Sequence, residues 1–154
     1  MRTSNRAINY WNGMLQSAFA AVILMTALAV NADELTGPGT SVVIQISSGD
    51  EQTQNLVLNN AANLQKELGM DNVQIEIVAY GPGLKMVTTS SQFRDRVESL
   101  ASQHLRFSAC ENTMAAIERK TGKKPVLANG VGTTPSGVAR IVALEQKGYA
   151  YVRP

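Results

Sequence analysis

The chain has 154 residues, with 14 lysines and arginines, 12 aspartates and glutamates, one histidine and one cysteine. Arg2 and Arg6 are the only charged residues before Asp33, so the rest of the chain is balanced in charge and has no long basic run. This excludes the electrostatic footprint of a nucleic-acid-binding protein, and a single Cys and His exclude an all-Cys/His zinc site and an internal disulfide. We therefore expect one domain with no metal, no cofactor and no nucleic-acid partner.

The first 32 residues have the layout of a secretory signal peptide. Two arginines precede the apolar run from Ala18 to Val30, and short residues follow up to Ala32. This run is shorter than the roughly 20 apolar residues that a membrane-spanning helix needs. We predict a signal peptide at 1–32, cleaved in a periplasmic protein with no stable membrane span, a short linker at 33–40 and a domain at 41–154. The alternative is an uncleaved anchor.

The rest of the chain alternates short β-rich runs with amphipathic helical patterns. The expected strands are 42–46, 73–80, 105–109, a fourth within 126–133, and 149–152. The expected helices present the apolar residues Val57, Ala61, Leu64 and Leu68 before Gly69; Phe93, Val97 and Leu100; Met114 and Ile117 before Gly122; and Val138, Ile141 and Val142 before Gly148. For the last helix, the sequence predicts Thr134 as the N-cap and Pro135 at the first helical position.

This alternation predicts an α/β fold, with a mostly parallel sheet covered by helices on both faces. The strand order stays open. In such sheets, ligands bind beyond the carboxyl ends of the strands. The candidate site segments are therefore Ser47–Asp50, Tyr80–Gly83, Cys110 and Thr133–Ser136.

Cys110 lies where the third predicted strand passes into a helix. The unpaired N–H groups and the dipole of a helix N-terminus favour an anion, so this thiol should ionise below the free value of about 8.5. Arg106 or His104 could add positive charge, whereas Glu111 opposes the effect. The alternative is a buried cysteine that acts as a small hydrophobic residue. Its position at the carboxyl end of a strand favours a reactive or ligand-facing thiol.

The glycine-rich segments do not match a nucleotide-binding motif. Gly81-Pro82-Gly83 lacks the third glycine of the dinucleotide fingerprint, and Gly130-Val131-Gly132 lacks its spacing. Both indicate tight turns, although the N–H groups of the first could hold a small anion near Lys85. Ser136 does not lie in the Gly-x-Ser-x-Gly pattern of a hydrolase.

Three segments together resemble a known family. They are Val78–Gly83, Phe107–Thr113, and Ser136–Val142 leading to the chain end at Gly148–Pro154. They are similar to the DsrE/DsrF-like family, in the YchN-related branch of small stand-alone proteins. The resemblance implies a three-layer α/β/α domain with a five-stranded parallel sheet, and assembly into trimers or hexamers. It also implies, from the sulfur-oxidation members, a cysteine that carries a persulfide between partner proteins, which by motif position is Cys110.

We therefore expect a sulfur carrier or sulfurtransferase that forms a persulfide on Cys110, with sulfur donor and acceptor proteins as partners. Asn112 and Thr113 are the expected hydrogen-bond partners of the thiolate. The other expected pocket residues are Tyr80, Gly81, Gly83, Lys85, Thr134 and Ser136. The alternative is a non-catalytic oligomeric module that binds a small ligand or a partner, in which Cys110 only lines the pocket.

The apolar residues Leu84, Met86 and Val87 follow a turn and precede a polar stretch. We expect this segment to form an interface that closes the Cys110 pocket of a neighbouring subunit, with Lys85 near an anion bound there. Local packing under the second helix is the alternative. Closed cyclic symmetry then favours a trimer, or two trimers paired in a hexamer.

Overall fold

The computed structural model describes residues 39–154, so the predicted signal peptide and most of the predicted linker lie outside the described residues. The strands are β1 (Thr40–Ile46), β2 (Val73–Ala79), β3 (Arg106–Cys110), β4 (Val131–Thr134) and β5 (Ala150–Val152). The helices are α2 (Glu51–Leu68), α3 (Arg94–Ser102), α4 (Glu111–Thr121) and α5 (Gly137–Glu145), with a 3₁₀ helix, η1 (Gly81–Val87), after β2. In this part of the chain, no helix is long and apolar enough to cross a membrane.

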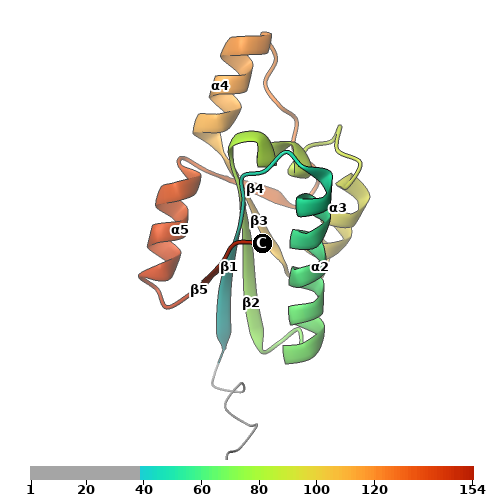
Figure 1. The fold of residues 1–154 in the computed structure, drawn as a ribbon, viewed down its shortest axis with the longest axis vertical. Coiled ribbons are helices and arrows are strands. Elements are labelled where there is room, and N and C mark those ends of the chain that lie inside the picture. The colour runs from blue at the N-terminus through green and yellow to red at the C-terminus, as the bar shows by residue number, and fades with distance from the viewer. Residues whose placement is uncertain (1–38) are drawn as a thin grey trace, which may run out of the picture. The chain divides into compact units, whose positions relative to one another are not determined.

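The five strands form one parallel sheet in the order β4-β3-β2-β1-β5. Helices α2 and α3 pack on one face of this sheet and α5 packs on the other (Figure 1). The predicted α/β fold with a mostly parallel five-stranded sheet is thus confirmed. Helix α4 extends past the carboxyl ends of the strands, where the candidate site was expected (Figure 1).

The central strands are buried on both faces, as parallel strands must be when helices cover each side. In β1, Ile44 and Ile46 belong to the main core with α2, whereas Val43 belongs to a smaller cluster under α5. Residues that alternate along a strand point to opposite faces, which explains this division. The carboxyl ends of β1, β2 and β3 are consequently held rigidly beside one another.

Helix α5 differs from its prediction at its start. Thr134 remains in β4, where it pairs with Cys110, and Ser136 is the N-cap. The Ser136 hydroxyl oxygen accepts a hydrogen bond from the Ala139 N–H at 3.4 Å. The predicted N-cap at Thr134 is wrong because a residue before proline favours extended backbone, which here continues the strand.

The buried face of α5 also differs from its prediction. Ile141 and Leu144 are buried, but Val138 is 56% exposed and Val142 is 48% exposed, although both were expected to face inward. The small cluster under α5 contains no other helix within the described residues. Without a helical neighbour to cover its flanks, α5 buries only the narrow stripe that faces the sheet.

The segment after β2 forms η1, a 3₁₀ helix that the sequence analysis did not anticipate. Leu84, Met86 and Val87 are at most 1% exposed and lie in the main core. They are therefore not available to a neighbouring subunit, and the predicted interface through them is wrong. η1 crosses close to the end of β1: a Cβ at Gly83 would lie 2.4 Å from the Ile46 carbonyl oxygen, so only glycine fits there.

Candidate functional site

Cys110 is both the last residue of β3 and the N-cap of α4. Its backbone is extended, with φ −74° and ψ 116°, and the next residue begins the helix. The side chain is 5% exposed and its thiol is free of any disulfide. The predicted strand-to-helix junction therefore places the sulfur at the carboxyl end of the sheet, close to its own helix N-terminus.

Backbone N–H groups from two helices lie near this sulfur and lower the pKa of its thiol. Asn112 and Thr113 belong to the first turn of α4, and Gly137 is the first residue of α5. The first N–H groups of a helix have no partner within the helix, so they are free to donate elsewhere. The two helix N-termini meet because β3 and β4 are neighbours and the Asn112 N–H reaches the Pro135 carbonyl oxygen at 3.3 Å.

The Thr113 hydroxyl also lowers the pKa of the thiol. Its oxygen accepts a hydrogen bond from the Gly81 N–H at 3.0 Å, which leaves the hydroxyl hydrogen for Cys110. The turn after β2 thereby orients the hydroxyl. Thr113 and Gly81, both expected at the site, are brought together although they are distant in sequence.

The net effect of these surroundings is a lowered pKa for the Cys110 thiol. Burial raises this pKa, but hydrogen bonds from the Thr113 hydroxyl and from the N–H groups of Gly137, Thr113 and Asn112 outweigh burial. Arg106, which was expected to add positive charge near Cys110, lies at the opposite end of β3. It pairs there with Glu76 of β2 and lowers the pKa of that carboxyl group. Hydrogen bonds rather than a cation therefore favour the thiolate.

Glu111, whose negative charge was expected to raise the pKa of Cys110, does not contribute to the shift of this pKa. Its side chain is exposed, and its carboxylate accepts a hydrogen bond from the Thr133 hydroxyl at 2.7 Å. Glu111 therefore contacts β4. His104 is exposed just before β3, at φ 70°.

A cavity of about 700 Å³ lies between η1 and α4, next to Cys110. Four of the predicted pocket residues line it: Gly81, Lys85, Asn112 and Thr113. Cys110 itself is not part of the lining, but Asn112 and Thr113 both line the cavity and help to lower the pKa of the Cys110 thiol. The cavity therefore lies beside the helix turn that directly follows Cys110.

The other predicted pocket residues pack against or cap the elements that form the site. Tyr80 packs on the start of α5, since a Cβ at Gly137 would lie 3.0 Å from the Tyr80 ring. Ser136 caps α5, Thr134 pairs with Cys110, and Gly83 permits the crossing of η1. None of these residues lines the cavity.

The loop Ser47–Asp50, also a candidate segment, lies against η1 instead of lining the cavity. Gly49 is close to Pro82, and Asp50 caps α2 by accepting a hydrogen bond from the Thr53 N–H at 2.7 Å. This loop therefore starts a helix and contacts the turn after β2.

Several cavity residues and the role of Gly137 were not predicted from the sequence. Ala116, Ile117 and Lys120 line the cavity together with Thr113. Their spacing of three, four and seven residues from Thr113 places all four on one face of α4. That periodicity was readable in the sequence, whereas the approach of Gly137 depends on the strand order.

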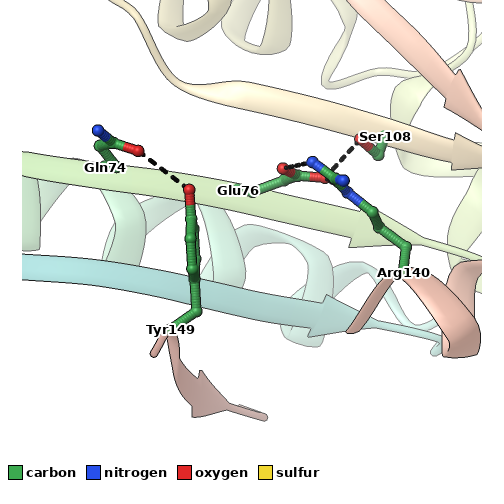
Figure 2. Close-up of polar contacts among 5 residues, drawn as sticks. All are labelled: Gln74, Glu76, Ser108, Arg140 and Tyr149. Atoms are coloured by element: carbon green, nitrogen blue, oxygen red, sulfur yellow. Dashed lines mark hydrogen bonds and ion pairs between the residues drawn. The ribbon is translucent and has the colours of Figure 1, made fainter. Parts of the chain in front are cut away.

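A buried ion pair ties α5 to the sheet (Figure 2). The Glu76 side chain in β2 is 1% exposed, and Arg140 donates to its two carboxylate oxygens at 2.7 and 2.6 Å. Ser108 in β3 donates to the same carboxylate at 2.7 Å, and Tyr149 bonds Gln74 farther along β2. In the sequence, Glu76 is the one charged residue of the otherwise mostly apolar stretch 73–79, and this could have indicated a buried ion pair.

The pKa of Glu76 reflects this pairing. Burial raises it, but hydrogen bonds from Arg140 and Ser108 and the charges of Arg140 and Arg106 lower it overall. Glu76 is therefore held as a carboxylate. Arg140 follows Gly137 by one helical turn, so the ion pair holds the N-terminus of α5 beside Cys110.

Comparison with known proteins gives both a family and a fold. The model of the DsrE/DsrF-like family matches residues 40–154. A solved protein of unknown function from Methanobacterium thermoautotrophicum, MTH1491, is 36% identical with a TM-score of 0.68, covering 75% of this chain and 99% of that one. The YchN protein from E. coli, 12% identical with a TM-score of 0.53, covers 75% and 97% and shows the fold alone. No curated protein sequence matches the chain significantly.

Proposed function

Because the chain belongs to the DsrE/DsrF-like family, which is associated with sulfur relay, we propose that it is a sulfur carrier that forms a persulfide on Cys110. The observation that carries this proposal is the position of Cys110 at the N-terminus of α4 and beside the N-terminus of α5, where N–H groups lower the pKa of its thiol. A thiolate is the nucleophile in sulfur transfer, and hydrogen-bond donors favour it over the thiol.

The proposed reaction needs no metal and no external oxidant. With thiosulfate as donor, the Cys110 thiolate attacks the outer sulfur, the S–S bond breaks, and sulfite leaves with the electron pair. Cys110 then holds that sulfur as a persulfide anion. In the second step, an acceptor thiolate attacks the outer sulfur and the Cys110 thiolate leaves. The same N–H groups stabilise the thiolate as nucleophile and as leaving group.

Intact-mass measurement tests this proposal. After incubation with polysulfide or thiosulfate, the protein should gain about 32 Da, the mass of one sulfur atom, and iodoacetamide should label Cys110 well below pH 8. Cys110→Ser is the control and should gain nothing. A native protein that stays unmodified with every donor, and unlabelled at every pH, would contradict the proposal.

A non-catalytic binding module is the second candidate, and the low exposure of Cys110 favours it. In that case, the Cys110→Ser variant keeps its fold and its affinity for the ligand. Adding the ligand raises the melting temperature of both the variant and the wild type, because the ligand binds only the native state. Loss of the cellular phenotype in Cys110→Ser, with fold and assembly intact, would instead favour the carrier.

We also propose that the chain is exported, on the evidence of its leader sequence alone. The basic start, the apolar run and the short residues before Ala32 support cleavage after that residue. N-terminal sequencing of the protein from a periplasmic fraction should begin at Asp33. A full-length chain in the cytoplasmic fraction would contradict export.

A further inference from the structure

The residues that line the cavity next to Cys110 indicate which class of ligand it binds. Resting on the proposed function, we infer that it binds an anionic organic persulfide, which donates its outer sulfur to Cys110. Four of the six lysines of the chain line this one cavity: Lys85, Lys120, Lys123 and Lys124. The described residues that line it include no aspartate or glutamate.

These lysines have no acidic partner in the described structure. The two ion pairs within residues 39–154 are Arg94–Asp95 and Arg140–Glu76, and neither touches the cavity. A hollow lined by unpaired charges of one sign concentrates ions of the opposite sign. The electrostatics of the cavity therefore favour an anion.

Helix end effects explain only part of this arrangement. Lys120 lies in the last turn of α4, and Lys123 follows the C-cap at Gly122, where positive charge complements the helix dipole. Lys85 lies in the last turn of a different element, η1, on the opposite side of the cavity, so the end of one helix does not account for all of these lysines. Lysines from two separate elements thus face the same space.

The size and the apolar wall indicate an organic ligand. Ala116, Ile117 and Pro125 contribute apolar surface, and the volume of about 700 Å³ is that of a cleft for small organic molecules. A small inorganic sulfur anion would leave this apolar surface without contact. An organic body with a negatively charged group satisfies both parts of the wall.

The position of the cavity connects such a ligand to Cys110. Thr113 lines the cavity and belongs to the first turn of α4, whose N-cap is Cys110, so a persulfide group placed at Thr113 lies on the side of the cavity nearest the thiolate. The thiolate attacks the outer sulfur of R–S–SH, the S–S bond breaks, and R–S⁻ leaves with the electron pair. Cys110 is left as S–SH with the proton of the donor, and no oxidant is consumed.

The chain offers a matched pair of variants for the test. Lys85→Gln/Lys123→Gln removes two charges from the cavity, and Lys66→Gln/Lys147→Gln removes the two lysines that lie elsewhere. The probe is S-hexylglutathione, a non-reactive thioether with carboxylates, measured by isothermal titration calorimetry. The neutral thioether hexyl thioglucoside is the probe control.

We expect the cavity variant to bind S-hexylglutathione about tenfold more weakly than the wild type, since two exposed ion pairs are lost. The control variant and Cys110→Ser should bind like the wild type, and the neutral probe should bind all proteins equally weakly. Equal affinities of the two double variants, or no saturable binding, would overturn the inference.

Mass spectrometry with two donors separates this inference from the proposed function. Glutathione persulfide should modify the wild type faster than the cavity variant. Modification by inorganic polysulfide without lysine-dependent binding would overturn the cavity inference and leave the carrier function standing. Lysine-dependent binding with no sulfur gained from either donor would overturn the carrier function and leave an organic-anion site.

Discussion

At the residue scale, the chemistry of Cys110 depends on polar groups from two helices, one of which is oriented by a third element. Asn112 and Thr113 come from α4, Gly137 comes from α5, and Gly81 in η1 orients the Thr113 hydroxyl. Burial alone would make this sulfur an inert thiol, as is usual for buried cysteines. The donors reverse that effect, which is why a nearly inaccessible sulfur is still a candidate nucleophile.

The Thr113 hydroxyl can be removed with little change of shape. In Thr113→Val, the sulfur loses one donor, so the pKa of Cys110 should rise and alkylation by iodoacetamide at pH 7 should slow about tenfold, since a hydrogen bond to a charged group is worth about 1.5 kcal/mol. The measurement is the pH profile of the alkylation rate. Thr113→Ser keeps the hydroxyl and should behave like the wild type; equal profiles for both variants would contradict this role.

At the scale of elements, α5 matters to the site through its position more than through its side chains. Its N-terminus supplies the Gly137 N–H, and the Arg140–Glu76 pair anchors the following turn to β2. Tyr80 sets the approach from the other side, because no side chain larger than hydrogen fits at Gly137 without displacing the ring. The anchoring of this helix is therefore linked to the reactivity of Cys110.

Glu76→Gln tests this link. At pH 7 the variant should be less stable by about 2 kcal/mol, because Arg140, which is itself partly solvated, loses its charged hydrogen-bond partner. The folded pKa of Glu76 is lowered, so its contribution is present above the unfolded value of about 4.3 and is lost as pH falls through the folded pKa. Urea unfolding at pH 7 and at pH 3 should show a difference that shrinks in acid.

The control for this experiment is Glu145→Gln, at the exposed end of the same helix. It should leave stability and alkylation of Cys110 unchanged, whereas Glu76→Gln should also slow alkylation if α5 shifts away from the sulfur. A Glu76→Gln variant that is destabilised equally at both pH values would contradict the ionised pair as the cause.

At the scale of the whole molecule, the two faces of the sheet are covered unequally. Among residues 39–154, two helices pack on one face, whereas α5 is the one helix in the small cluster on the other face. Beside α5, a hollow of about 430 Å³ is lined by residues of β3 and β4 and by Arg140. Val138 and Val142 are exposed on α5, one helical turn apart. We propose that a second copy of the chain covers this face, in a trimer or a hexamer of two trimers.

Sedimentation velocity at micromolar concentration tests the assembly. The wild type should sediment as a trimer or hexamer, and Val138→Glu/Val142→Glu should shift it to a monomer, because two charges replace an apolar contact. Leu56→Glu is the control, since Leu56 is an exposed apolar residue of α2 on the other side of the sheet. A monomeric wild type would contradict the proposal.

Local patterns in the sequence were sufficient for the elements and for the position of Cys110. Alternation of apolar strands with amphipathic helices predicted five strands and four helices, all of which are present, and Gly69 and Gly122 end α2 and α4 as expected. The same local reasoning placed Cys110 at a strand-to-helix junction. Such features depend on residues within one or two turns of each other, so hydrophobic periodicity and capping residues determine them.

Only the tertiary structure decided which elements meet at the site. The strand order places α5 beside α4, pairs Glu76 with Arg140 across 64 residues, and brings Gly81 to Thr113 across 32. It also buries Leu84, which resembled an interface residue, and exposes Val142, which resembled a core residue. Periodicity shows that a residue lies on one face of an element, but the neighbours of that face depend on chain topology. The lysines of the cavity are separated in sequence and converge for that same reason.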